Sequence, residues 1–206
     1  MGLKPARISI SQGELKGRSI PLPPAVAGHR HFTPALFKDA AFQLLENNVT
    51  PGPFWDLCAG SGQMAMEALS RGYDPVYLVE LDRQRFQWLK NRVCAGYSVQ
   101  LHNKDFLRVV PLILAPEDGS TVCFVDLPYS FWQRDGSCEK LESFLDNLRK
   151  HQEGRPLPYI LVQAPAPWRI KQEAVQAWLK SAYGTDQRDY RGQKLILLTP
   201  DSPQNA

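Results

Sequence analysis

From residue 54 onward, short β-prone runs alternate with helical segments, and this alternation narrows the possible folds more than any other feature. We expect strands at residues 54–58, 76–80, 99–102, 122–126 and 159–163, and helices at residues 63–70, 83–95, 139–151 and 167–180. Strands separated by helices favour a parallel sheet wound with helices over a sandwich or a barrel. Residues 186–191 and 194–198, parted by Gly192 and Gln193, predict an antiparallel hairpin at the C-terminal end.

The N-terminal part of the chain has a different pattern. Residues 7–11 and 15–22 are β-prone and are separated by a short turn, which predicts a small hairpin, and the proline-rich residues 21–28 predict a linker. Thr33 and Pro34 are typical of a helix start, and apolar residues then recur at helical spacing as far as about Asn47. We therefore divide the chain into a hairpin with its linker, residues 1–32, and an α/β domain, residues 33–206.

Composition excludes several classes of protein. A chain of 206 residues that is 43% hydrophobic and 22% charged can bury its own core. Its 4 cysteines lack the spacing of a disulfide scaffold or a zinc site, so we expect no metal and a reducing, cytoplasmic location. No apolar run reaches the roughly 18 residues of a membrane span, and residues 1–7 lack the layout of a signal peptide, so we expect no membrane association.

Positive charge is concentrated at the N-terminus. The formal net charge is only +3, but residues 1–31 have Glu14 as their single acid against five basic residues: Lys4, Arg7, Lys16, Arg18 and Arg30. Such a surplus is compatible with a solvated edge or with a nucleic-acid contact, and composition does not separate the two.

A glycine turn between the first predicted strand and helix of the α/β domain is the most informative motif. Gly60 and Gly62 lie in the stretch Asp56-Leu-Cys-Ala-Gly-Ser-Gly, where they allow close approach of a ligand to the backbone. The helix that follows offers free N–H groups. Glu80 ends the next predicted strand, where a carboxylate can accept hydrogen bonds from both hydroxyls of a ribose. Together these residues indicate a nucleotide-like cofactor.

Two cofactors fit this pattern, because the glycines and Glu80 suit NAD as well as S-adenosylmethionine. Asp56 distinguishes them: an acid inside the strand suits the ammonium group of a methionine moiety and has no role beside a pyrophosphate. Asp105 and Phe106, just after the third strand, are candidates for contacting an adenine by a hydrogen bond and a ring contact, although an Asp at this place also caps a helix.

A second motif, Asp126-Leu127-Pro128-Tyr129, ends the fourth predicted strand. In an open α/β sheet this edge is where ligands bind. An exocyclic amino group of a base is a poor nucleophile, because its lone pair is delocalised into the ring. Asp126 and the Leu127 carbonyl are candidates for accepting its two hydrogens, and Tyr129 for stacking on the base. Alignment of the reactants then supplies on the order of 7 to 11 kcal/mol, without a metal.

At this point the sequence resembles the RsmD-type methyltransferases, which modify the N2 amino group of a guanine in small-subunit (16S) ribosomal RNA. The resemblance lies in Lys16-Gly17-Arg18, residues 56–62, Glu67-Ala-Leu-Ser-Arg-Gly, Val79-Glu80 and residues 126–129, and spans residues 7–200. It implies a Rossmann-like class I methyltransferase fold, with a mostly parallel seven-stranded sheet, S-adenosylmethionine as cofactor, and a monomer acting on ribosomal RNA or the small ribosomal subunit.

The resemblance also assigns roles to residues. Gly60 and Gly62 would contact the methionine moiety, Glu80 the ribose, and Asp105 with Phe106 the adenine. Asp126, Pro128 and Tyr129 would form the catalytic motif, and Lys16, Arg18, Arg30 and His31 would bind RNA. Two departures stand out: Leu127 replaces the first proline of the usual Asp-Pro-Pro motif, and His31 stands where an arginine is usual, beside Arg30.

Three alternatives remain open at this stage. The Asp-Pro-Pro-Tyr type of chemistry is shared with N6-adenine methyltransferases of DNA, although 206 residues leave no room for a separate DNA-recognition domain. A non-catalytic RNA-binding protein that retains the fold would also explain Leu127. A nicotinamide-dependent dehydrogenase is the third.

Overall fold

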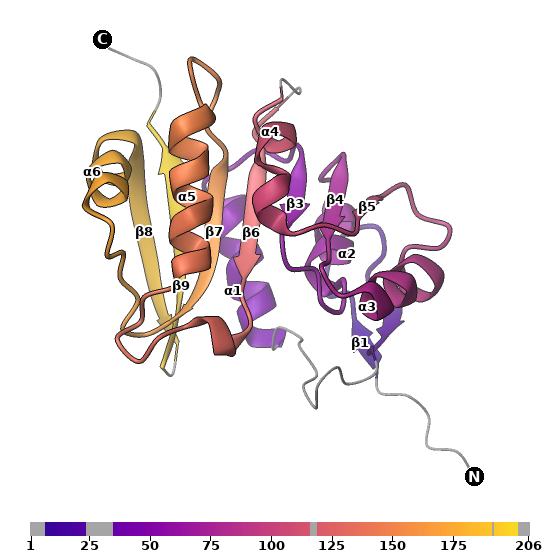
Figure 1. Ribbon diagram of the computed structural model, residues 1–206. Helices are drawn as coiled ribbons and strands as arrows, with labels where there is room; N and C mark the ends of the chain where they lie inside the picture. Colours follow the sequence, from indigo (N-terminus) through magenta and orange to yellow (C-terminus); the bar gives the residue numbers. More distant parts are fainter. Residues whose placement is uncertain (1–6, 24–34, 116–118, 191, 202–206) are drawn as a thin grey trace.

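The computed structural model describes residues 7–23, 35–115, 119–190 and 192–201. These residues form a seven-stranded sheet in the order β5-β4-β3-β6-β7-β9-β8 (Figure 1). Strands β3 to β7 are parallel, and β9 pairs antiparallel with both β7 and β8. The predicted class, a mostly parallel sheet with an antiparallel C-terminal hairpin, is confirmed. The strands are β3 (Phe54–Asp56), β4 (Val76–Val79), β5 (Gln100–His102), β6 (Val122–Asp126), β7 (Tyr159–Pro165), β8 (Tyr183–Tyr190) and β9 (Gln193–Pro200).

Helices cover both faces of the sheet. In Figure 1, α4 and α5 lie in front of the strands and α1 lies behind them. In the described ranges, no helix is long and apolar enough to cross a membrane. The α-helices are α1 (Ala35–Glu46), α2 (Gln63–Ser70), α3 (Arg83–Trp88), α4 (Val110–Ile113), α5 (Glu139–His151) and α6 (Glu173–Ala182), and shorter turns are η1 (Leu89–Val93), η2 (Phe106–Arg108) and η3 (Tyr129–Phe131).

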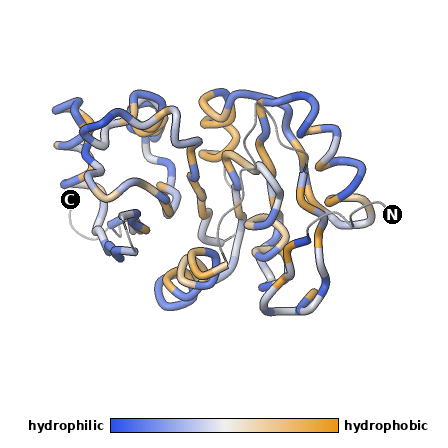
Figure 2. The backbone as a smooth tube through the Cα atoms, turned by 90° about the horizontal axis from the view of Figure 1, so that it is seen from below, coloured by the Kyte–Doolittle hydropathy of each residue, from blue (hydrophilic) through white to orange (hydrophobic). Residues whose placement is uncertain are grey.

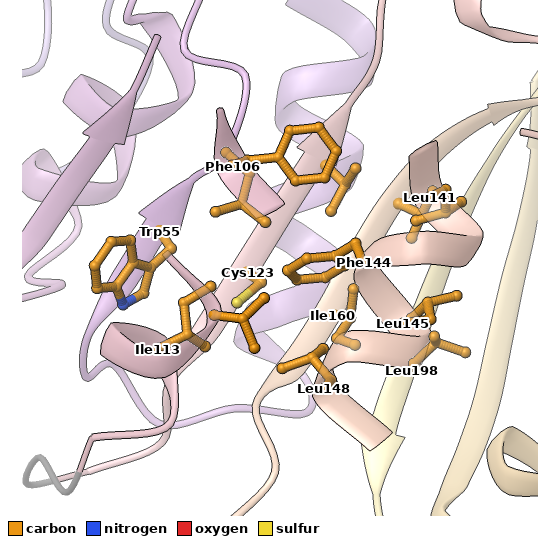
Figure 3. Packing of buried hydrophobic residues seen from close by; sticks show 14 of the residues in the cluster. Trp55, Phe106, Ile113, Cys123, Leu141, Phe144, Leu145, Leu148, Ile160 and Leu198 are labelled. Atoms are coloured by element: carbon orange, nitrogen blue, oxygen red, sulfur yellow. The ribbon is translucent and has the colours of Figure 1, made fainter. Parts of the chain in front are cut away.

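Alternating side chains of the strands build two hydrophobic cores. On the α5 face, Trp55 and Cys123 pack in one cluster with Phe144 (Figure 3), whereas Phe54 and Phe124 belong to the cluster on the opposite face. This alternation follows from the two-residue period of a strand. Figure 2 shows the result as hydrophobic inner strands and hydrophilic outer helical turns. The central strands β3, β4 and β6 are therefore buried on both faces, whereas the edge strand β8 is mostly exposed.

The predicted N-terminal hairpin is present, with shorter strands than expected. β1 (Arg7–Ser9) pairs antiparallel with β2 (Ser19–Pro21). The intervening loop is held by α2, since the backbone N–H groups of Ser11 and Gln12 donate to the Glu67 carboxylate at 2.9 and 3.1 Å. In the loop, these hydrogen bonds to α2 stand in place of hydrogen bonds between the two strands of the hairpin.

Two predicted helices differ from the structure. The helix expected over residues 167–180 begins only at Glu173. The buried Glu142 carboxylate accepts hydrogen bonds from the N–H groups of Lys171 and Gln172, and these bonds hold the backbone just before the helix in an extended conformation. The helix expected over residues 83–95 is divided into α3 and the π-helical turn η1. Thr33 and Pro34, the predicted start of the first helix, lie outside the described residues.

The strand order reverses beside β3, which positions the site. The chain moves from β3 outward to β4 and β5, then returns to the other side of β3 as β6. Asp56 of β3 is in parallel register with Phe124 of β6. Loops leaving two strands at such a reversal diverge to opposite faces and leave a crevice at the carboxyl ends, where α/β proteins bind ligands.

Candidate active site

A cavity of about 700 Å³ lies at the carboxyl ends of β3, β4, β6 and β7. It brings together loops from distant parts of the chain, including those around residues 60 and 126. Of the predicted cofactor and catalytic residues, those that line it are Asp56, Gly60, Glu80, Asp105, Phe106, Asp126, Pro128 and Tyr129. The sheet therefore gathers both sequence motifs around one space.

Asp56 is a buried acid at the cavity floor, where 2% of the residue is exposed. Its Oδ2 accepts a hydrogen bond from the Ala65 N–H at 3.2 Å, at the start of α2. Its pKa is raised to about 7, mainly by burial; the hydrogen bond from Ala65 opposes this shift, and the charges of Asp126 and Glu80 add to it. Asp56 is thus a buried carboxyl group whose ionised form a cationic ligand would stabilise.

Glu80 connects the glycine turn to the next strand. Its Oε2 accepts from the Gly60 N–H at 3.1 Å and its Oε1 from the Asp82 N–H at 2.9 Å. Burial raises its pKa although these two N–H groups oppose the shift. The carboxylate therefore fixes the conformation of the turn and at the same time lines the cavity.

Gly62 has a structural reason to be glycine. Its φ is +76°, and a Cβ atom there would lie 2.9 Å from Cδ2 of Leu89 and 3.1 Å from Cγ1 of Val93. Its N–H donates to the Ala59 carbonyl at 2.6 Å, and Gly62 is not among the described residues that line the cavity. The close approach of η1 to the turn requires this glycine, and its contact with a cofactor stays a prediction.

Asp105 and Phe106 form one wall of the cavity. Oδ1 of Asp105 accepts from the Leu107 N–H at 3.1 Å, which caps η2, and Oδ2 pairs with Nζ of Lys140. Burial acts to raise the pKa of Asp105, but the hydrogen bonds from Lys140 and Leu107, together with the positive charges of Lys140 and Arg108, outweigh it and leave the pKa below its usual value. Phe106 packs edge-on against Phe144, with ring centres 5.7 Å apart. Asp105 thus has a capping role and an ion pair already in place, and its predicted adenine contact is untested.

The Asp126 motif forms the opposite wall. Leu127, in place of a proline, is 4% exposed and belongs to the hydrophobic core. Its carbonyl accepts a long hydrogen bond from Nε1 of Trp132 at 3.4 Å, which leaves one lone pair of that oxygen for another donor. Tyr129 is 78% exposed and Phe131 41% exposed at the cavity mouth, so this wall ends in an aromatic rim.

Several residues that line the cavity have no role assigned from the sequence. Gln163 lies beside Asp126 in the β6–β7 register, and its Nε2 donates to Oε1 of Gln193 at 3.0 Å. Such a cross-strand neighbour leaves no local signal in the sequence. Phe131 and Trp132 directly follow the Asp126 motif, and their spacing from Tyr129 could have identified them.

The predicted RNA-binding residues are only partly described. Lys16 and Arg18 are exposed on the hairpin, and Nη1 of Arg18 donates to Oη of Tyr97 at 3.2 Å. Arg30 and His31 lie outside the described residues. Within the described part of the chain, no group of three or more His, Cys, Asp or Glu side chains is arranged to hold a metal ion.

Comparisons with known proteins agree with this architecture. "Putative rRNA methyltransferase YlbH" of Bacillus subtilis is 31% identical over 124 residues, which cover 58% of this chain and 66% of that protein. A solved structure, "Putative methyltransferase yhhF" of Escherichia coli, matches with a TM-score of 0.72 at 19% identity and covers 95% of this chain and 99% of its own. The rRNA methyltransferase aviRa of Streptomyces viridochromogenes matches with a TM-score of 0.56 at 16% identity, covering 84% of this chain and 87% of its own.

The family model described as "Conserved hypothetical protein 95" matches residues 8–189. This range contains the glycine turn, the strand-order reversal and both walls of the cavity. The chain belongs to this family, the RsmD family, and has the fold of the class I methyltransferases.

Proposed function

We propose that this protein transfers a methyl group from S-adenosylmethionine to the exocyclic N2 amino group of a guanine in 16S ribosomal RNA. The observation that carries the proposal is the meeting of the Gly60 turn and the Asp126 motif in one cavity at the strand-order reversal. Cofactor and target base must approach each other there within a few ångströms, which loops from adjacent parallel strands permit.

The charges at the cavity floor support S-adenosylmethionine over a dinucleotide. Asp56 and Glu80 are buried acids whose pKa values are raised mainly by burial, so a ligand with an ammonium and a sulfonium group would stabilise their ionised forms. A pyrophosphate would add negative charge beside them. Glu80 would hold the ribose hydroxyls, and Phe106 offers an apolar contact for the adenine. When bound, this cofactor supplies an electrophilic methyl group.

Asp126 would orient the amino group of the guanine. Its carboxylate accepts one hydrogen of that group and the Leu127 carbonyl accepts the other through its remaining lone pair, which directs the nitrogen lone pair toward the cofactor. Tyr129 at the mouth offers a stacking surface for a base turned out of its helix. Pro128 fixes the backbone φ between these groups at −49°.

The name of the Bacillus subtilis relative supports RNA as the substrate class. We infer that the protein acts in the cytoplasm as a monomer on ribosomal RNA or on the small ribosomal subunit, and that Lys16, Arg18, Arg30 and His31 contact RNA phosphates. The division between an RNA-contacting segment, residues 1–32, and the methyltransferase domain, residues 33–206, is part of this proposal.

Asp126→Asn tests the catalytic assignment. Labelled cofactor is incubated with small ribosomal subunits from cells lacking this protein, and cofactor binding is measured separately by calorimetry. We expect the variant to bind cofactor as the wild type does and to lose methyl transfer by a factor of about 100 or more, in the range for a positioned acid–base group. Asp186→Asn, the same change on the exposed strand β8, is the matched control. Undiminished methyl transfer by Asp126→Asn would refute the role of Asp126, and methylation of duplex DNA instead of RNA would refute the substrate.

A further inference from the structure

The segment between β4 and β5 has a one-sided charge pattern. Residues 83–104 contain no Asp or Glu and five basic residues: Arg83, Arg85, Lys90, Arg92 and Lys104. Except for Arg85, which is buried, these side chains are exposed. Soluble surfaces normally intersperse both signs, so a segment that lacks acids between Asp82 and Asp105 concentrates positive potential.

Ion pairing distinguishes this segment from much of the C-terminal half of the chain, where Arg108, Arg134, Arg155 and Lys180 are the described basic residues after Lys104 without an ion pair. Within the described residues, none of its exposed cations forms an ion pair, and the same holds for Lys16 and Arg18 of the hairpin. On the C-terminal half of the chain, most described basic residues are paired with an acid: Lys140, Arg149, Lys150, Arg169, Lys171, Arg188 and Lys194. Pairing cancels the field of a cation locally, so the unpaired cations have their charge available for a partner.

The segment connects the hairpin to the cavity. Arg83 and Lys104 line the cavity at one end. At the other end, just after η1, Oη of Tyr97 accepts the hydrogen bond from Arg18 of the hairpin. Figure 1 shows β1 on the same side of the molecule as α3. Because η1 packs closely on Gly62, its cations are held at a fixed place relative to the glycine turn.

We propose that α3, η1 and the residues up to Lys104 form a binding track for the phosphate backbone of RNA, which leads from the hairpin to the cavity mouth. This proposal rests on the proposed function and adds the surface that holds the RNA flanking the target base. The exposed aromatic residues Tyr129 and Phe131 at the end of the track suit stacking with an unpaired base. An acidic protein partner could also bind the cations, but it would have no unpaired base to stack on Tyr129 and Phe131.

The double variant Lys90→Gln/Arg92→Gln tests the track, because both residues are exposed and lie outside the cavity lining. Its control is Arg155→Gln/Lys180→Gln, which removes the same charge from two exposed cations that have no ion pair in the described part of the chain and also do not line the cavity. Binding of a labelled 16S ribosomal RNA fragment is measured by fluorescence anisotropy between 50 and 200 mM salt, a range in which phosphate contacts dominate the salt dependence.

We expect the slope of log K against log salt, which is negative, to become shallower by about 1.4 to 1.8 in the track variant, since each phosphate contact contributes about 0.7 to 0.9 to its magnitude. At 0.1 M salt, Kd should rise by about 25- to 60-fold. The control variant should bind as the wild type does. An unchanged Kd and slope in the track variant overturn the proposal, as does an equal loss in the control. If the track variant loses RNA binding while the wild type methylates no RNA, the track stands and the proposed function fails.

Discussion

Replacing Glu67 with alanine should release the N-terminal hairpin and destabilise the whole domain. The carboxylate lies on α2 with its side chain fully buried and accepts hydrogen bonds from three helical or loop segments. Its donors are the Ser11 N–H (2.9 Å), the Ser11 hydroxyl (2.6 Å), the Gln12 N–H (3.1 Å), Nζ of Lys38 (2.6 Å), and Nε and Nη2 of Arg71 (3.1 and 3.0 Å). One side chain thus ties the hairpin, α1 and α2 together.

The magnitude follows from the partner that is left behind. The Lys38 side chain is 2% exposed, and without Glu67 the one partner left to its ammonium among the described residues is the Ser9 carbonyl, 2.9 Å away. Breaking a buried ion pair from one side costs about 3–5 kcal/mol, because the other charge remains desolvated. At this chain length, we expect the midpoint of thermal unfolding to fall by about 6 to 20 °C.

Urea denaturation of Glu67→Ala and of Glu173→Ala, an exposed control, measures this difference. A loss below about 1 kcal/mol in Glu67→Ala would show that the ion pair contributes no more than an exposed one and would refute the reasoning. The double variant Lys38→Met/Glu67→Ala separates the contributions, since removing both charges removes the unpaired ammonium. We expect it to be more stable than Glu67→Ala.

The pH dependence of stability provides a second measurement on Glu67. Burial acts to raise its pKa, but hydrogen bonds from Lys38 and Ser11 outweigh burial and lower the pKa below 4.5. A lowered folded-state pKa means that this stabilisation is present above the unfolded-state pKa and is lost as the pH falls through the folded-state value. The wild type should therefore lose stability below about pH 4.5, and Glu67→Ala should lack this part of the decline.

Three further predictions concern the hairpin and the cavity. Gly13→Ala should lower the free energy of unfolding, measured by urea denaturation, by about 1–3 kcal/mol or more, because φ is +79° and the new Cβ would lie 1.7 Å from the Ser70 carbonyl oxygen. Gly17→Ala is the control: φ is +81° there, but the space around the new Cβ is open, so the loss should be smaller. Since the pKa of Asp56 is about 7, calorimetry should show S-adenosylhomocysteine binding about tenfold more weakly at pH 6 than at pH 8, and this dependence should vanish in Asp56→Asn. Tyr129→Ala should leave thermal stability unchanged, because the residue is 78% exposed, but should reduce methyl transfer at low RNA concentration by about tenfold or more.

Much of the fold and of the candidate site could be predicted, because the signals were local. Strand-forming runs followed by helical periodicity gave the parallel sheet, and the short connection from Asp56 to Gly60 placed an acid and a turn at the same strand end. Asp126 ends β6 as predicted, and Glu80 directly follows β4, which ends one residue earlier than predicted, at Val79. Since parallel strands of a wound sheet end at one edge, residues at those ends meet without further information.

Contacts between distant segments were not predictable in this way. Gly62 looked like a ligand-binding glycine, but the structure shows the side chains of Leu89 and Val93 against it. The role of Glu67 depends on Ser11 and Lys38, which lie 56 and 29 residues away in the sequence. Local patterns carry no record of such partners.

The sequence by itself determined which residue types stand at the ends of the strands, and through them the class of fold and the chemistry of the cavity. Only the tertiary structure decided which groups already have a partner. Lys140 forms an ion pair with Asp105, Trp132 donates a hydrogen bond to the Leu127 carbonyl, and Glu67 of α2 accepts a hydrogen bond from the hairpin loop. The physical reason is that the backbone pattern fixes a residue's position along its own element, whereas burial, pKa and hydrogen-bond partners depend on the elements packed against it.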